Sequence, residues 1–143
     1  MVDSRVKGRN GENDVKKLLV RHTRLDWQRV PLSGALPFMK GDLFVPNEKM
    51  KYCVEVKSYK DSAISHLLIH GKPVLYKWWE QTTSQSKNGM LPLLFFKHNR
   101  SPIYVMIEGM PNTVQDFIFI NSKEASIMLA KDWLELDQPE FVL

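Results

Sequence analysis

The sequence predicts an α/β fold in which helices flank a central mixed β-sheet. Two short β-prone segments, residues 43–45 and 52–56, are separated by turn-forming residues and predict a β-hairpin. Amphipathic helical patterns lie before this hairpin, at about residues 10–23, and after it, at residues 73–88. A hairpin between two helices, with further strands after the second helix, is typical of a sheet whose faces are covered by helices.

The first predicted helix carries an acidic residue on its inner face. Residues 8–11 form a flexible basic segment, and the helix is expected to begin at about residue 10. Glu12 then falls in the first turn. Val15 and Leu19 follow it at i+3 and i+7, which places all three residues on one face. Two interpretations of Glu12 stay open: a first-turn acid that complements the helix dipole, or a carboxylate aimed at a metal ion.

The second half of the chain completes the predicted sheet. The helix at residues 73–88 is expected to bury Trp78 and Trp79 and to stop at Gly89. Residues 91–97 form a continuous apolar run, typical of a strand buried on both faces. The remaining predicted elements are two strands and a last helix, at residues 103–108, 117–120 and 121–133.

The segment of residues 61–72 has no clear pattern. It holds His66 and His70 at i and i+4, a spacing that suits two ligands on one helix face. No third ligand lies nearby in the sequence, so a zinc site is not expected. The segment is expected to cover the sheet, to contact a binding partner or to form part of a dimer interface.

Three charged residues of the predicted hairpin are expected to meet on one sheet face. Asp42 opens the first strand, and Glu55 and Lys57 lie two residues apart on the second, so their side chains point the same way. Alone, Glu55 and Lys57 would be an ordinary surface salt bridge. With Asp42 at hairpin distance, two carboxylates and an ammonium suit a divalent cation held beside a phosphate.

A polar loop leads into this cluster. Arg29 lies at the end of a predicted strand, and Ser33 and Gly34 then form a tight turn upstream of Asp42. Two interpretations of Ser33 stay open: a plain turn residue, or a hydroxyl that contacts a phosphate.

The order Glu12, Ser33-Gly34, Gly41-Asp42, Glu55-x-Lys57 resembles the PD-(D/E)xK nuclease superfamily. It is most similar to the small archaeal-type (Hjc-like) Holliday junction resolvases and their phage-encoded relatives, over roughly residues 5–97. The resemblance implies a restriction-endonuclease-like core and a nuclease that resolves four-way DNA junctions. One departure is that the proline of the family name is Gly41 here.

The resemblance also implies a role for each matching residue. Metal ligands would be carboxylates and one backbone carbonyl, those of Glu12, Asp42, Glu55 and Val56. Lys57 would be the catalytic lysine, Ser33 the loop serine, and Gln81 an amide beside the site. The implied cofactor is Mg²⁺, with Mn²⁺ as a substitute.

The implied partners are branched DNA and a second copy of the chain. Two symmetric nicks need two sites, so a homodimer is expected. Trp78, Trp79 and the apolar strand at residues 91–96 predict an interface near them. Two alternatives remain open: another repair or DNA-degrading nuclease of the same superfamily, or a non-catalytic DNA-binding module.

Length and composition agree with a small enzyme. The 143 residues predict one domain, residues 1–143, and 43% hydrophobic residues supply a modest core. The single cysteine, Cys53, excludes an internal disulfide and predicts a cytoplasmic setting, which is the host cytoplasm if the protein is phage-encoded. No signal peptide or membrane span is expected.

The basic residues are concentrated near the amino terminus. The net charge is +4, and a basic arm at about residues 1–10 is expected to lie outside the first helix. Basic side chains beside an acidic metal site suit a polyanion. The residues expected to contact DNA are Arg5, Lys7, Arg9, Arg29, Lys40 and Lys60.

Overall fold

A computed structural model of the protein describes residues 4–31, 41–60, 73–86 and 89–143, and the side chains from residue 9 onward within these ranges. Its centre is a seven-stranded sheet in the order β1-β2-β3-β4-β5-β7-β6. The strands are β1 Gln28–Arg29, β2 Leu43–Phe44, β3 Tyr52–Tyr59, β4 Leu91–His98, β5 Tyr104–Glu108, β6 Ile118–Ile120 and β7 Ala125–Leu129. The pair β3–β4 is parallel and all other pairs are antiparallel. The prediction of a mixed sheet is therefore confirmed.

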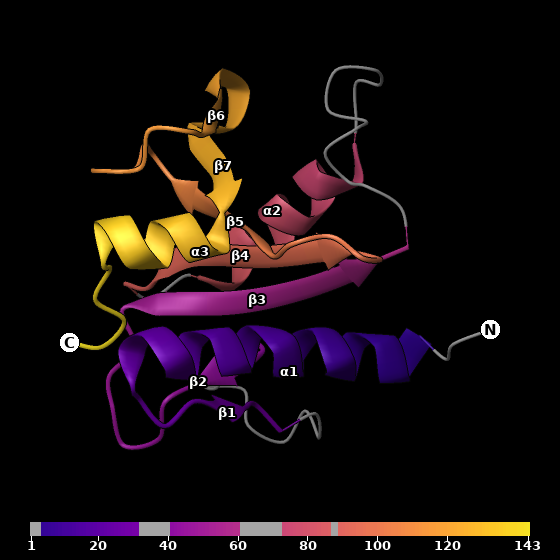
Figure 1. The fold of residues 1–143 in the computed structure, drawn as a ribbon, viewed down its shortest axis with the longest axis vertical. Coiled ribbons are helices and arrows are strands. Elements are labelled where there is room, and N and C mark those ends of the chain that lie inside the picture. The colour runs from indigo at the N-terminus through magenta and orange to yellow at the C-terminus, as the bar shows by residue number, and fades with distance from the viewer. Residues whose placement is uncertain (1–3, 32–40, 61–72, 87–88) are drawn as a thin grey trace.

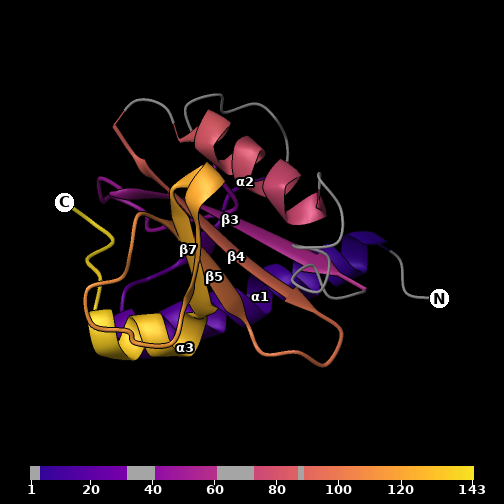
Figure 2. The ribbon, with the colours of Figure 1, turned by 90° about the horizontal axis from the view of Figure 1, so that it is seen from above.

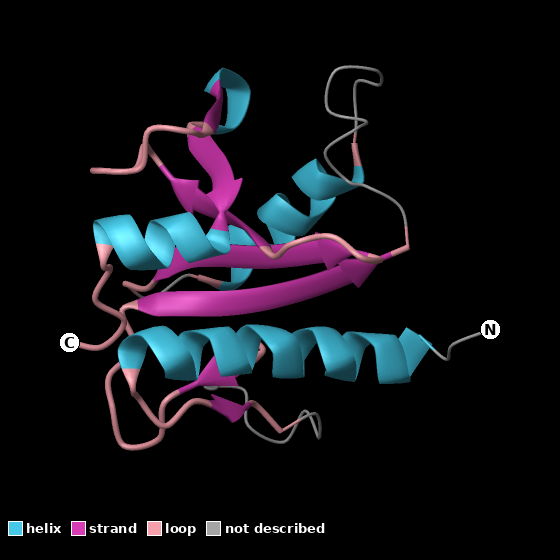
Figure 3. Ribbon diagram, viewed as in Figure 1, coloured by secondary structure: helices cyan, strands magenta, loops and turns pink. Residues whose placement is uncertain are grey.

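Helices cover both faces of this sheet. They are α1 Ser4–Thr23, α2 Val74–Gln85, η1 Asn121–Lys123, α3 Ala130–Asp132 and the π-helical turn η2 Trp133–Asp137. Helix α1 runs beside β3 on the same side of the sheet as α3, and α2 lies on the other side (Figures 1 and 2). Figure 3 shows the same arrangement with the elements coloured by type.

The two faces have separate hydrophobic cores because side chains alternate along each strand. One core packs Val15 and Leu19 of α1 against Val54 and Val56 of β3. The other packs α2 against Leu94, Phe96 and Met106. Residues of opposite parity in β3, including Glu55, therefore belong to the α2 side of the sheet.

The predicted hairpin is confirmed. Strands β2 and β3 are antiparallel, with Leu43 opposite Val54, and the Asp42 amide donates to the Val54 carbonyl at 2.7 Å. Strand β1 extends the hairpin, because Arg29 pairs with Leu43 and the Val30 amide donates to the Asp42 carbonyl at 2.9 Å. Backbone bonds thus fix Asp42 from both sides.

The predicted start of the first helix is wrong. Helix α1 begins at Ser4, so the expected basic arm is the first part of the helix, and Glu12 lies in its third turn. A glycine inside a helix costs up to about 1 kcal/mol, which flanking helix-forming residues and packing against β3 can offset. The first-turn interpretation of Glu12 is therefore excluded.

Two later predictions also need correction. Helix α2 ends at Gln85 with Ser86 as its C-cap, before Gly89, which has a φ of +90°. The predicted last helix contains strand β7, followed by only a short helix at Ala130–Asp132. Pairing of β7 with β5 and β6 on either side overrides the helical propensity of its alanine and methionine residues.

The apolar surplus expected to form a dimer interface is used inside the chain. Trp78 and Trp79 are 9% and 3% exposed, and Phe95 and Phe96 are 0% and 2% exposed. Trp78 packs against Tyr59 and Phe96, with ring centroids 5.7 and 6.3 Å apart. Trp78, Trp79 and Phe96 belong to the core on the α2 side of the sheet, and Phe95 belongs to the core on the α1 side. Among the residues described, no helix is long and apolar enough to cross a bilayer.

Candidate active site

Asp42 and Glu55 form a close pair of carboxyl groups at the edge of β3. Asp42 precedes β2, and its Oδ2 accepts a hydrogen bond from the Val56 amide at 2.7 Å. Glu55 is 5% exposed in the middle of β3, and its carboxyl lies within hydrogen-bonding reach of Asp42. Lys57, two residues along the same strand, is near enough to act electrostatically on Glu55. The three residues predicted from the hairpin motif are therefore neighbours.

Gly41 gives Asp42 this position. Its φ is +87°, a value that proline, fixed near −65°, cannot adopt. A Cβ at this residue would lie 2.7 Å from the Val54 carbonyl oxygen. Glycine at the position of the family's proline is thus a requirement of this turn, and it leaves the carboxylate after it in place.

The Glu55 carboxyl is held in an environment that favours its neutral form. Burial is the largest cause, the neighbouring charge of Asp42 is the second, and together they raise the pKa of Glu55 to about 8. Lys57 lowers this pKa and Glu12 raises it, both by smaller amounts. The pair of acids is therefore short of positive charge, even with the lysine present.

Glu12 lies near this pair but has a different partner. Its Oε2 accepts a hydrogen bond from Nε of Arg29 at 2.8 Å, and its side chain is 15% exposed. Burial raises the pKa of Glu12, the bond from Arg29 lowers it, and the charge of Asp42 raises it. Within the described ranges, no three His, Cys, Asp or Glu side chains stand together closely enough to hold a metal ion.

The donors at this edge are of the type that magnesium prefers. Asp42 and Glu55 offer carboxylate oxygens, and a bound cation would offset both the burial and the Asp42 charge that favour neutral Glu55. The amide and carbonyl of a strand residue project to the same side, so the Val56 carbonyl faces the edge where its amide meets Asp42. A hard divalent cation therefore fits two carboxylates and one backbone oxygen, with water as its remaining ligands.

The structure describes only some of the other predicted site residues. Ser33 and Lys40 lie outside the described residues, as do His66 and His70. Arg9 is exposed on α1, and Lys60 is exposed just after β3. Arg5 and Lys7 belong to α1, but their side chains are not described.

Gln85, and not Gln81, contacts the turn that carries Asp42. Gln81 is exposed on α2, and the described residues give it no contact with the carboxylates. Gln85, one helical turn later, accepts a hydrogen bond from the Gly41 amide at 3.4 Å. The i+4 spacing from Gln81 is the only sequence signal that could have suggested it.

Ser58 and Gly11 show how closely α1 approaches β3 next to the site. A Cβ on Gly11 would lie 1.9 Å from Ser58 Oγ and 3.1 Å from Ser58 Cβ. Ser58 Oγ is buried and is the one such side-chain atom without a hydrogen-bond partner in the described part of the chain. Neither role was predicted from the sequence. A glycine inside a helical pattern was the available signal for a close approach.

Replacing Gly11 by Ala is expected to destabilise the protein by about 1–3 kcal/mol, because the new methyl group overlaps Ser58 and pushes α1 away from β3. Chemical denaturation measures this. Asn10→Ala is the control, since Asn10 is exposed on the same helix. Ser58→Ala removes an unpaired buried hydroxyl and should recover part of the loss in the double variant. Equal stability of Gly11→Ala and Asn10→Ala would contradict the packing argument.

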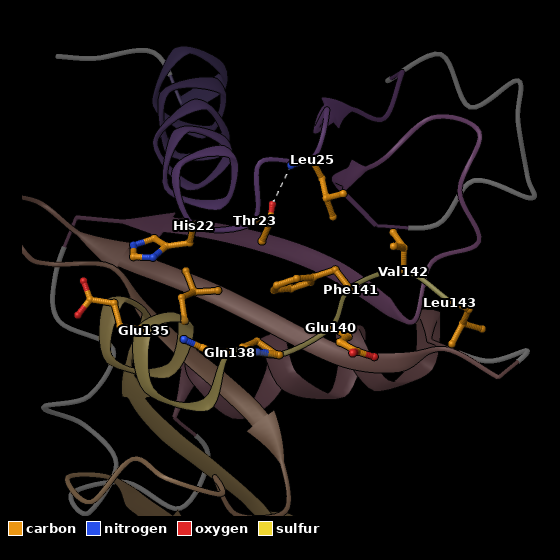
Figure 4. Close-up of a pocket in the computed structure, with 11 residues that line it drawn as sticks. His22, Thr23, Leu25, Glu135, Gln138, Glu140, Phe141, Val142 and Leu143 are labelled. Atoms are coloured by element: carbon orange, nitrogen blue, oxygen red, sulfur yellow. Dashed lines mark hydrogen bonds between the residues drawn. The ribbon is translucent and has the colours of Figure 1, made fainter.

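A separate pocket lies at the other end of α1 (Figure 4). Its volume is about 750 Å³, and it is formed by the last turn of α1, the turn η2 and the carboxyl-terminal residues. The Leu25 amide donates to Thr23 Oγ1 at 3.2 Å at its rim. Its lining includes His22, Glu135 and Phe141, and none of the residues predicted to act on a phosphate.

Comparisons with known proteins agree with the geometry at β3. The chain matches a protein family described as "Phage putative PDDEXK endonuclease" over residues 3–134, which include the whole acidic cluster. It is 35% identical to Protein D14 of Escherichia phage T5 over 148 aligned positions, which cover 93% of this chain and 92% of that protein. No solved structure is significantly similar to it.

Proposed function

We propose a function from the premise that this chain belongs to the phage PD-(D/E)xK endonuclease family, whose members are phosphodiester hydrolases and generally use a divalent metal. The proposed activity is Mg²⁺-dependent cleavage of four-way DNA junctions by paired symmetric nicks. The observation that carries it is the cluster of Asp42, Glu55 and Lys57 at the edge of β3. Junction DNA as the substrate rests on the order of the motifs along the chain.

Each residue of the cluster has a proposed part in the hydrolysis. Asp42, Glu55 and the Val56 carbonyl would hold Mg²⁺, which supplies Lewis-acid stabilisation of the phosphate when bound. Lys57 orients or deprotonates the attacking water and neutralises charge on the phosphate. Ser33 is proposed to position the scissile phosphate, and a glutamine of α2 to hold the water. Gln81 is the proposed glutamine by resemblance, and Gln85 by its contact with Gly41.

DNA is proposed to approach along the first half of α1. Arg9 is exposed there, three residues before Glu12, and acts electrostatically on it. Arg5, Lys7, Lys40 and Lys60 are the further proposed contacts. These basic residues are proposed to contact phosphates and not bases, so DNA binding would depend on the charge and shape of the DNA more than on its sequence.

A homodimer is proposed because a junction is nicked on two strands related by symmetry, and this chain supplies one site. Burial of the residues first expected at the interface leaves its location open to experiment. The phage T5 relative supports a protein that works in the cytoplasm of an infected bacterium.

Purified protein with Mg²⁺ is expected to nick a four-way junction at least tenfold faster than a linear duplex of the same sequence. The paired nicks should be symmetric and ligatable, with 5′ phosphates. Gel mapping of each labelled strand measures the cuts, and light scattering measures the mass. A monomer that cuts linear duplex equally well would replace the junction proposal with that of a repair or DNA-degrading nuclease. Binding without cleavage would support a non-catalytic module.

A further inference from the structure

Among the residues that the structure describes, Arg29 contacts the site through one nitrogen, its Nε. Its Nε holds Glu12, and no described residue bonds to its Nη1 or Nη2. The side chain is 29% exposed, and its strand is tied to Asp42 by the bond from the Val30 amide. A guanidinium group beside Glu12 and Asp42 is suited to bind a phosphate, because a phosphate accepts two N–H bonds at once.

The same ion pair engages Glu12 beside the acidic pair. Glu12 is near enough to Asp42 and Glu55 to influence the pKa of Glu55, yet the described carboxylates do not form a set of three around one point. The carboxylate is held by Arg29 instead. The third ligand that the motif predicts is therefore present but engaged elsewhere.

We propose that Arg29 acts as a latch, which means that it holds the Glu12 carboxylate in the free protein and releases it when DNA binds. The guanidinium exchanges the Glu12 carboxylate for a phosphate of the bound DNA, and the released Glu12 joins Asp42 and Glu55 around the cation. Arg29 is thus a positioning residue that couples DNA binding to cation binding. This inference rests on the proposed function of the site.

The strength of the ion pair suits such an exchange. A pair with both side chains partly exposed typically shifts an equilibrium by less than about tenfold. A phosphate that takes two guanidinium bonds, with a cation that attracts Glu12, can exceed this. Coupling of this kind is reciprocal, so the cation must strengthen DNA binding by the same factor.

Calorimetric titration of Ca²⁺ into the protein without DNA tests the latch. Calcium takes the same oxygen ligands as magnesium. Arg29→Gln frees Glu12 and is expected to bind Ca²⁺ about threefold to fivefold more tightly than the wild type, the size typical of one partly exposed ion pair. The double variant Arg29→Gln/Glu12→Gln should lose this gain. In the presence of duplex DNA, the wild type should gain Ca²⁺ affinity by a larger factor than Arg29→Gln does.

The matched control is Lys97→Gln. Lys97 makes a similar ion pair with α1, through Asp14 at 3.2 Å, and its side chain is 26% exposed. The Lys97→Gln variant should bind Ca²⁺ as tightly as the wild type does. Equal affinity of Arg29→Gln and the wild type would overturn the latch, as would a gain that persists without Glu12. If Asp42→Asn binds Ca²⁺ as well as the wild type, the proposed metal site itself fails. Circular dichroism confirms that each variant is folded.

Discussion

Replacing Asp42 by Asn lowers the rate of Mg²⁺-dependent DNA cleavage by about a thousandfold or more, if the acidic pair at β3 is the catalytic centre. The substitution removes one carboxylate from the cation site. It keeps a side-chain oxygen that can still accept the bond from the Val56 amide, so the turn should keep its shape. DNA binding should stay the same or become stronger, because a negative charge that repels phosphate is gone.

Asp14→Asn is the matched control for this variant. Asp14 lies on α1, pairs with Lys97 and is not among the charges that act on Glu55, so its loss should leave cleavage unchanged. Single-turnover cleavage and fluorescence anisotropy measure the rate and the binding separately. Cleavage by Asp42→Asn within a few-fold of the wild type would remove the acidic pair from the mechanism. A parallel loss of DNA binding would indicate a damaged fold.

The local part of the site could be predicted from the sequence. Alternation along one strand places Glu55 and Lys57 on one side, and a short turn places Asp42 beside them. These relations depend on residues close together in the chain, which is why the hairpin was predicted correctly. The buried run that became β4 was predicted for the same reason, since its apolar composition is itself the signal.

The contacts that complete the site join residues far apart in the chain, so no local sequence pattern predicted them. Arg29 meets Glu12 across 17 residues, and Gly41 meets Gln85 across 44. Both contacts depend on where α1 and α2 dock, which is decided by the packing of whole faces. The helix predicted over the residues of β7 was wrong for a related reason. The local propensity of these residues is helical, but pairing with two neighbouring strands decided the outcome.

The raised pKa of Glu55 has a consequence for stability that needs no DNA. In the unfolded chain the carboxyl loses its proton near pH 4.5, whereas in the folded protein it keeps the proton up to about pH 8. Between these values the folded state binds more protons than the unfolded state. The free energy of unfolding of the metal-free protein must therefore fall as the pH rises through this range, and Glu55 contributes its full stabilisation only below pH 4.5.

Glu55→Gln is expected to remove most of this dependence, because the amide carries no charge at any pH in the range. Between pH 5 and pH 8, the wild type should lose about 2–5 kcal/mol more of its free energy of unfolding than the variant does. Urea denaturation in EDTA at several pH values measures this. Glu108→Gln is the control, since Glu108 is exposed on β5 and its replacement should leave the wild-type slope intact.

Saturating Mg²⁺ at pH 8 should restore stability to the wild type but not to Glu55→Gln, because a cation replaces the lost proton only where the carboxylate remains. Identical pH slopes for the wild type and Glu55→Gln would mean that Glu55 is ionised in the folded protein. Its burial and the charge of Asp42 would then not raise its pKa.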